Sequence, residues 1–458
     1  MILFADESLA SAVTAFRKLD VESLLLPVMV QLIVIILVAR AFGGLFRRFH
    51  QPAVVGEMVA GIVMGPSLFG ALFPEMFQLV FKPHLEHVPD ALTNAAFPKI
   101  FTALAQIGLI LLLFLIGLEF EFHHLKAKGT AAVLICVVGI AVPFLLGVGL
   151  ARVIHPELEP HPEKGVVPIF GLTLFLGMAL SITALPVLGR MLLEMGVTRT
   201  RIAVVAIAAA AIGDAVGWVL LAAVSALAQS SFDPAATLTM IGLTVAFFAA
   251  MLFVVRPLAG RYFRWSLAAN HGQFSLNAMA VLLVLMLLSA TATNVIGIFA
   301  IFGAFALGAV LSDQTEFREA VTARLRDFVT AFFLPIFFTY TGLRTEISSL
   351  TTPTHWLICG GVILTAILGK LGACGLTARL TGFSAKESVI LGAMMNTRGL
   401  MELIVINVGY DLGVIPKSLF CILVLMAVVT TVMTTPILLR LRHGTEIDGP
   451  MKQSGFLD

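Results

Sequence analysis

The stretch 202–228 reads IAVVAIAAAAIGDAVGWVLLAAVSALA, and Asp214 is its only charged residue. A run of this length is sufficient for a helix to cross the hydrocarbon core of a membrane, which takes about 20 apolar residues. A carboxylate near the middle of such a helix costs about 2.5–3.5 kcal/mol on insertion scales, so intramembrane acids usually face a cavity and handle ions or protons. The stretch therefore predicts a membrane protein that moves an ion.

The rest of the chain is similarly apolar. Hydrophobic residues make up 59% of the 458 residues and charged ones 12%, with a mean hydropathy of +1.02, which excludes an ordinary soluble domain. We therefore predict an all-α polytopic membrane protein, with residues 1–440 as a single membrane unit and 441–458 as a short tail. Apolar windows predict thirteen transmembrane helices, approximately at 24–42, 54–72, 100–120, 130–153, 167–188, 202–228, 236–255, 274–292, 296–312, 328–343, 355–378, 387–408 and 419–439.

The basic residues indicate the orientation. With thirteen spans and the N-terminus outside, the cytoplasmic loops and tail hold 19 Lys and Arg residues and the outer segments 8. This imbalance follows the positive-inside rule, so we expect the N-terminus outside and the C-terminus in the cytoplasm. The N-terminal segment lacks the basic region of a cleavable signal, so the first span should direct insertion. The expected location is the bacterial inner membrane, with the lipid bilayer as a partner and no nucleic acid.

Two of the predicted spans carry features that interrupt a helix. In 167–188, Pro186 removes a backbone donor, and Ser181 and Thr183 can satisfy the freed groups. Span 387–408 is interrupted near its middle by the polar run Asn396, Thr397, Arg398 and Gly399. The two spans are the fifth and the twelfth, so they cross the membrane in opposite directions. Interrupted helices at corresponding places in inverted repeats predict a binding site at the midplane.

Other charges lie inside predicted spans. Lys370 lies near the middle of 355–378, and we predict that it is the charge partner of Asp214 or a proton carrier. The alternative is that its ammonium group extends to the membrane interface. Arg398 and Glu402 are four residues apart, so they share a helix face and are expected to pair and to support the second interruption.

A single intramembrane carboxylate suits the exchange of a cation for a proton, because protonation removes the charge that the cation needs. We expect Asp214, the hydroxyls of Thr183 and Ser181, freed carbonyls and water to ligate Na⁺ or K⁺, by extension of the oxygen preference of hard cations. Apart from the transported ions, no cofactor is expected. The four cysteines lie in apolar spans, at spacings that predict neither a disulfide framework nor a metal site.

Several stretches resemble one transporter family. They include QPAVVGEMVAGIVMGPSLFG (51–70), SITALPVLGRML (181–192) and NTRGLMEL (396–403), the last following the lone Lys370. Together with the Asp214 helix, they resemble the monovalent cation:proton antiporter-2 family, which includes Kef-like bacterial and plant exchangers. The resemblance extends from about residue 24 to 440.

The resemblance implies a homodimer that works by alternating access. The ion-transporting core is expected at about 130–228 and 355–439, with the two interrupted helices crossing inside it. The dimerisation scaffold is expected at about 24–120 and 274–343, and a linker helix at about 236–255. It also implies that Asp214 binds cation and proton in turn, with Lys370 and Arg398 as nearby counter-charges. Family members usually place Asp, Asn or Gln before the ion-binding Asp, whereas this chain has Gly213, which favours electroneutral one-for-one exchange.

Other functions remain as alternatives to a secondary-active Na⁺ or K⁺/proton antiporter. A cation channel is expected to show a filter such as TVGYG, which the sequence lacks. A sodium-coupled solute symporter shares the interrupted helices but needs a larger polar cavity. An enzyme is not expected, because no H-E-x-x-H or nucleophile–base set stands in the spans.

Overall fold

The chain is described by a computed structural model that covers residues 21–84, 90–118, 130–162, 165–229, 234–454 and 456. Over these residues the secondary structure is helical, apart from one isolated bridge between His161 and Gly165. The prediction of an all-α fold is therefore confirmed for this part of the chain. The N-terminal segment, expected outside the membrane, lies outside the described residues, as do the last two residues of the span predicted at 100–120.

The helices of the N-terminal half are α2 (Val21–Arg48), α3 (Ala53–Met64), α4 (Phe69–Leu72), α5 (Pro74–Phe81), α6 (Asp90–Leu118), α7 (Thr130–Ile154), α8 (Ile169–Ser181), α9 (Leu185–Glu194), α10 (Arg201–Gln229) and α11 (Pro234–Ala250). Those of the C-terminal half are α12 (Arg256–Ala269), α13 (Leu276–Ile296), α14 (Ala300–Leu311), α15 (Thr315–Phe328), α16 (Leu334–Leu343), α17 (Pro353–Ile367), α18 (Ala373–Leu380), α19 (Ala385–Met395), α20 (Leu400–Asp411), α21 (Lys417–Val432), α22 (Thr434–Leu441) and α23 (Asp448–Gln453). Short π-helical segments join α11 to α12, α15 to α16 and α17 to α18.

Helix ends follow local sequence signals. Ser384 and Glu387 form a reciprocal capping box at the start of α19, which satisfies two backbone N–H groups that lack helical partners. Gly297 ends α13 with a φ of 101°, a left-handed conformation that glycine adopts without the penalty of a Cβ. These signals fix where the apolar helices begin and end.

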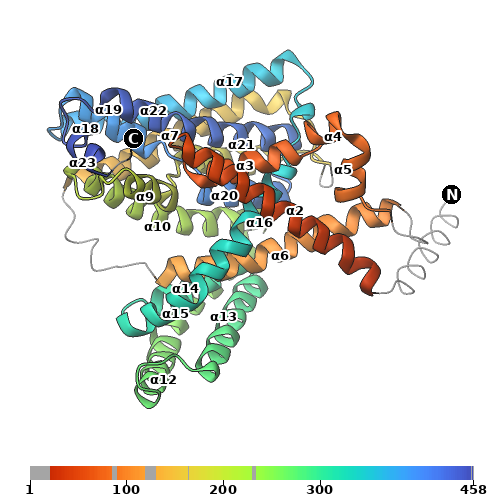
Figure 1. Cartoon of the computed structure of the whole chain (residues 1–458), viewed down its shortest axis with the longest axis vertical. Helices are drawn as coiled ribbons and strands as arrows, with labels where there is room; N and C mark the ends of the chain where they lie inside the picture. The colour runs from red at the N-terminus through yellow and green to blue at the C-terminus, as the bar shows by residue number, and fades with distance from the viewer. Residues whose placement is uncertain are drawn as a thin grey trace.

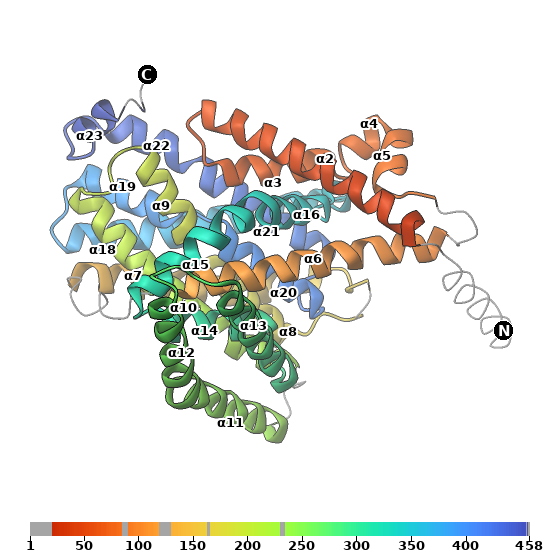
Figure 2. The same cartoon turned by 60° about the horizontal axis from the view of Figure 1, so that its bottom comes forward.

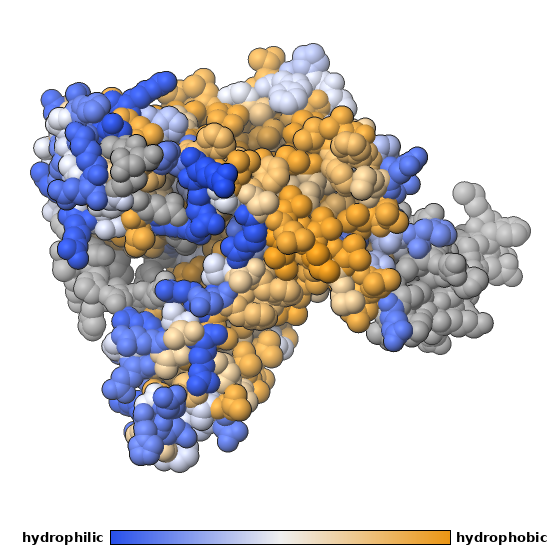
Figure 3. Space-filling view, viewed as in Figure 1, coloured by the Kyte–Doolittle hydropathy of each residue, from blue (hydrophilic) through white to orange (hydrophobic). Residues whose placement is uncertain are grey.

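The surface and the helix lengths are those of a multi-pass membrane protein. Among the described residues, nine helical stretches are long and apolar enough to cross a membrane, and the bent pair α19 and α20 makes a tenth. Figure 3 shows a broad apolar surface between polar regions at two ends of the molecule. Helices α8 and α14 are apolar but have only 13 and 12 residues. Each segment predicted to span coincides with one helix or a consecutive pair, and the count of thirteen stays a prediction.

The helices pack in two groups. In the central bundle, α7–α10 and α17–α22, α7 packs on α8, α10 and α18, and α20 packs on α8, α10 and α21. In the flanking bundle, α2–α6 and α12–α16, α6 packs on α14 and α16, and α3 packs on α2 and α16. Helix α11 contacts both α10 and α13, so it joins the two groups. Figures 1 and 2 show α12 and α13 apart from α18 and α19 in both views.

Candidate ion-binding site

The helices interrupted near Pro186 and Arg398 meet at their interruptions. The first break lies at 182–184, between α8 and α9, and the second at 396–399, between α19 and α20. The Thr183 hydroxyl donates a hydrogen bond of 2.8 Å to the Met395 carbonyl, and the Ala184 amide donates one of 3.0 Å to the Thr397 carbonyl. Non-helical backbone at membrane depth must be hydrogen-bonded within the protein. The first break therefore supplies hydrogen-bond donors to the carbonyls of the second, and the second supplies acceptors to the first.

Two residues permit this close approach. Pro186 lies in the first turn of α9, where a missing backbone donor costs no helical hydrogen bond. Gly399 precedes α20, and a Cβ at this position would lie 2.7 Å from Cγ2 of Val187. A larger residue at 399 would therefore push α9 away from the second break.

Two buried cations converge on the C-terminus of α8. The Arg398 guanidinium donates to the carbonyls of Ala179 and Leu180, the latter at 2.7 Å. The Lys370 ammonium donates to the Ser181 carbonyl and, at 2.7 Å, to the Gly139 carbonyl of α7. The last carbonyls of a helix lack helical partners and carry its negative dipole end. Lys370 and Arg398 therefore supply both hydrogen bonds and positive charge where α8 ends.

Lys370 lies in the π-helical segment Leu368–Gly372 and is 1% exposed. The alternative in which its ammonium extends to the membrane interface is therefore wrong, because the group is held by buried carbonyls on either side. No direct ion pair joins Lys370 to Asp214 within the described chain. Its role as charge partner or proton carrier stays a prediction.

Asp214 lies on α10 beside the first break. Its carboxylate accepts a hydrogen bond from the backbone amide of Leu185, the first residue of α9. The N-terminus of a helix presents free N–H groups and a positive dipole end, which suit a carboxylate. The residue is 7% exposed, and its Oδ1 has no hydrogen-bond partner in the described residues. The Leu185 amide therefore holds the carboxylate in place, while Oδ1 is left to bind a proton or a cation.

The hydroxyl groups expected to ligate a cation are both buried. The Ser181 hydroxyl donates 2.9 Å to the Met178 carbonyl in its own helix, and that of Thr183 donates across to Met395. Because both protons are directed to carbonyls, the oxygen lone pairs are left to accept or to ligate.

The second break contains the other predicted residues. The Arg398 guanidinium lies 3.4 Å from the Glu402 carboxylate, as their spacing predicts, and both side chains are fully buried. Asn396 ends α19, and its amide contacts the sulfur of Met433 at 3.8 Å. The Asn396 Oδ1 and the Thr397 hydroxyl have no hydrogen-bond partners among the described residues.

Sequence reasoning missed the contribution of α21 and α22. The Thr431 hydroxyl accepts from the Arg398 amide and donates to the Arg398 carbonyl, both at 2.9 Å. The Thr434 hydroxyl donates to the Ala393 carbonyl of α19 at 3.1 Å. The signal was the run TTVMTT at 430–435, four threonines in an otherwise apolar span. No group of three or more His, Cys, Asp or Glu residues is placed to hold a metal in the part of the chain that is described.

The chain is similar to known cation/proton antiporters. The model of the transmembrane sodium/hydrogen exchanger family matches residues 33–441. The chain is 37% identical over 426 residues to the Na⁺/H⁺ antiporter NhaS4 of Synechocystis, covering 92% of this chain and 98% of that protein. It is 36% identical over 420 residues to cation/H⁺ antiporter 20 of Arabidopsis thaliana, and 31% over 412 residues to K⁺/H⁺ antiporter 1 of Saccharomyces cerevisiae. Each match covers 89% of this chain, which spans about half the length of these two relatives, 47% and 45%.

A solved structure is similar in fold. The sodium proton antiporter MjNhaP1 from Methanocaldococcus jannaschii superposes with a TM-score of 0.61 and 15% sequence identity. The match covers 94% of this chain and 100% of that one. The shared fold therefore extends over nearly all of both chains.

Proposed function

The chain belongs to the sodium/hydrogen exchanger family, and we propose that it exchanges Na⁺ or K⁺ for protons at Asp214, one for one, by alternating access. It is a cation/proton antiporter, and its family is one of transporters rather than enzymes. The channel and symporter alternatives are therefore set aside.

The observation that carries the role of Asp214 is its half-satisfied carboxylate. The group is buried at the positive end of α9, beside the break, and Oδ1 has no partner among the described residues. A buried charge without a partner is costly, so this oxygen favours either a proton or a cation. Because the two ligands share it, binding of one displaces the other, which is the requirement for exchange.

The neighbouring groups hold this carboxylate in place. Lys370 and Arg398 fix the end of α8, and Ala184 is tied to the second break, so the N-terminus of α9 is held beside Asp214. The oxygens of Thr183 and Ser181, with water, would complete the coordination of a desolvated alkali cation. The positive charge of Lys370 favours release of the proton when the cation arrives.

One-for-one exchange is favoured by the residue before Asp214. Gly213 supplies no second carboxylate, although a Cβ there would meet nothing closer than the Cys136 sulfur at 3.9 Å. A Cβ therefore fits at this position, but the position supplies no acid. Exchange of one cation for one proton moves no net charge across the membrane.

We propose that thirteen spans form inverted repeats whose interrupted helices cross in the central bundle. That bundle would move against the flanking bundle, which would form the interface of a homodimer. The N-terminus would lie outside and the C-terminus in the cytoplasm of a bacterial inner membrane, as the basic loops indicate. Small residues allow close helix packing within the flanking bundle: a Cβ at Gly61 would lie 2.2 Å from the Thr339 carbonyl oxygen.

The test is transport by purified protein in lipid vesicles with an imposed pH gradient and added Na⁺, K⁺ or Li⁺. We expect cation-dependent loss of the pH gradient, at a rate that does not change when the membrane potential is clamped. Asp214→Asn should reduce this exchange at least 100-fold, because the amide cannot exchange a proton or neutralise a cation.

Glu57→Gln is the matched control, because Glu57 is also a buried carboxylate in an apolar helix but lies in the flanking bundle, 3.8 Å from Arg40. This variant should retain exchange. Both variants should elute as monodisperse protein. Retained cation-dependent proton movement in Asp214→Asn would show that the assignment is wrong. Competition between Na⁺ and K⁺ at several pH values then identifies the preferred cation.

A further inference from the structure

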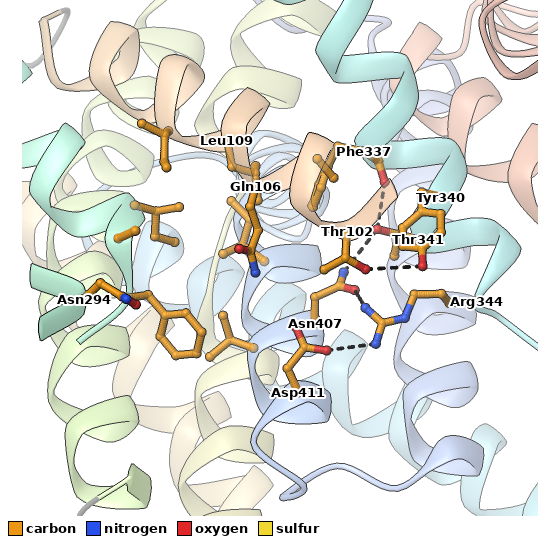
Figure 4. A pocket seen from close by; sticks show the side chains of 17 residues that line it. Thr102, Gln106, Leu109, Asn294, Phe337, Tyr340, Thr341, Arg344, Asn407 and Asp411 are labelled. Atoms are coloured by element: carbon orange, nitrogen blue, oxygen red, sulfur yellow. Dashed lines mark hydrogen bonds and ion pairs between the residues drawn. The ribbon is translucent and has the colours of Figure 1, made fainter. Parts of the chain in front are cut away.

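The segment that follows α16 carries two opposite charges, and both reach the central bundle. The guanidinium of Arg344 lies 2.9 Å from Oδ1 of Asp411 and 3.0 Å from Oδ1 of Asn407, both on α20. Figure 4 shows these side chains pointing toward one another across the gap between the helices. Two residues further on, Glu346 forms an ion pair with Lys417, the first residue of α21. The charge pattern is therefore reciprocal: the segment after α16 supplies the cation of the first pair and the anion of the second.

These contacts are better held than ordinary surface ion pairs. The Arg344 guanidinium lies over the ring of Tyr410, 4.8 Å from its centroid, which adds a cation–π contact. The side chains of Arg344 and Asp411 are 21% and 34% exposed. Although partial burial raises the pKa of Glu346, hydrogen bonds from Lys417 and Ser348 lower it further. The pKa of Glu346 therefore lies below its ordinary value, and its pair is charged at neutral pH.

The two helices that are joined belong to different bundles. Helix α16 packs mainly on α3, α6 and α2, whereas α20 packs on α21, α8 and α10. The two helices contact each other, but a cavity of about 160 Å³ lies between parts of them beside the ion pair, and its polar lining includes Gln106, Asn294 and Asn407. The Asn407 amide also donates 3.1 Å to the Thr341 hydroxyl of α16. Arg344 and Asn407 thus bridge a gap that side-chain packing leaves partly open.

The bridge lies on the same helix as the second break. Helix α20 begins at the second break and ends at Asp411, so Glu402 and Asn407 lie on one continuous helix. A helix rises 1.5 Å per residue, so the bridge lies about 18 Å along α20 from the break. Any rigid movement of the central bundle against the flanking bundle changes the contacts of Arg344 and Glu346.

We propose that Arg344 and Glu346 form a clasp that closes the two bundles against each other at this end of the molecule and opens in each transport cycle. The inference rests on the proposed alternating access. Arg344 is then a positioning residue that determines from which face of the membrane Asp214 is reached. Loss of the clasp shifts the population of conformations towards those open at the clasp face.

The test compares apparent KM values for the cation from the two faces, in vesicles of opposite orientation. The clasp face is the side of the membrane at which Arg344 and Glu346 lie. The double variant Arg344→Gln/Glu346→Gln should lower the cation KM measured from the clasp face relative to the KM measured from the opposite face. The ratio of the two KM values should change at least threefold. Arg344→Lys retains the charge but loses the planar fork that binds Asp411 and Asn407 together, so its ratio should be intermediate.

Arg256→Gln/Asp313→Asn is the matched control, because that ion pair joins two residues of the flanking bundle. It should leave the ratio unchanged. An unchanged ratio in the clasp variant, or one that moves in the opposite direction, would overturn the proposal. Because the ratio is measured in variants that transport, this failure is distinct from failure of the proposed exchange, which the Asp214→Asn comparison reports.

A second experiment tests directly whether the clasp must open during transport. The four natural cysteines are buried, whereas the side chains of Glu346 and Lys417 are in contact and are 31% and 39% exposed, so cysteines placed at these two positions form an accessible thiol pair between the bundles. Cross-linking this pair with a short bifunctional thiol reagent should reduce exchange at least tenfold, while each single cysteine variant stays active after the same treatment. Full exchange by the cross-linked protein would show that the clasp need not open.

Discussion

Each of the two breaks exposes the carbonyls at the end of a helix, but those carbonyls are neutralised in different ways. At the first break, the carbonyls that end α8 are met by cations from distant parts of the chain, Lys370 and Arg398. At the second break, the carbonyls that end α19 are met by neutral hydroxyls, from Thr183 and Thr434. Positive charge is therefore concentrated at only one of the two helix ends.

The carboxylates near the two breaks, Asp214 and Glu402, also differ in how close they lie to a positive charge. Asp214 comes from a separate helix, and one of its oxygens has no hydrogen-bond partner among the described residues. Glu402 belongs to the first turn of α20 itself. Its two oxygens also lack hydrogen-bond partners among the described residues, but its carboxylate lies 3.4 Å from the guanidinium of Arg398. The comparison indicates that one break presents a carboxylate to an ion, while the other holds its carboxylate in a buried ion pair. Arg398 connects the two, because it neutralises Glu402 and caps α8.

The largest effect on this comparison is expected from Arg398→Gln. The change leaves the Ala179 and Leu180 carbonyls without their donor, and it leaves the buried Glu402 carboxylate without its neighbouring positive charge. Removal of one partner of a buried ion pair costs about 3–5 kcal/mol. We expect a large fall in the melting temperature in detergent.

The control is Arg398→Gln/Glu402→Gln, which removes the stranded charge. It should recover part of the lost stability, because the buried carboxylate then has no charge to compensate. Equal melting temperatures for the single and double variants would mean that Arg398 does not balance Glu402, and the distinction between the two breaks would fail.

The positions of both breaks could be predicted from the sequence, because each depends on local chemistry. Pro186 cannot continue a helix, and the polar run at 396–399 interrupts an apolar span. Asp214 was also recognisable, because a single charge in a long apolar run is costly. By contrast, nothing local indicates that Lys370 and Arg398 meet the same helix end, since that depends on the packing of α8 against α7, α20 and the segment around Lys370.

Other features were not accessible for the same reason. The threonine run at 430–435 is visible in the sequence, but nothing in it indicates that the partner of Thr431 is the backbone of Arg398, 33 residues away. Arg344 reads as one more basic residue in an outer loop, although it reaches Asp411 on another helix. Such contacts depend on tertiary structure, and hydropathy contains no record of them.

An intermediate effect is expected from Lys370→Met, which keeps a long side chain but removes the ammonium. The change leaves the carbonyls of Gly139 and Ser181 unpartnered without stranding a carboxylate. Unsatisfied buried acceptors cost about 1–3 kcal/mol each. The loss of stability should therefore be smaller than for Arg398→Gln, while exchange falls because α8 and the first break are less well held.

Melting temperatures and initial exchange rates, measured on the same preparations, check this order. A Lys370→Met variant with full stability and no exchange would instead mean that the ammonium group acts in transport itself, as the charge partner of Asp214 or as a proton carrier. A loss of stability larger than that of Arg398→Gln would mean that the end of α8 depends mainly on Lys370.

The smallest effects are expected at the hydroxyls, from Thr431→Val and Thr183→Val, which keep the side-chain shape. Hydrogen bonds between membrane helices average about 0.6 kcal/mol. Thr431 makes two such bonds to the backbone of Arg398 and Thr183 makes one to Met395, so Thr431→Val should lower the melting temperature more. Only Thr183→Val should also alter the apparent KM for the cation, because Thr183 lies in the break beside Asp214. If Thr431→Val changed KM equally, the second break would take part in binding, and the division between an ion-binding break and a structural one would no longer hold.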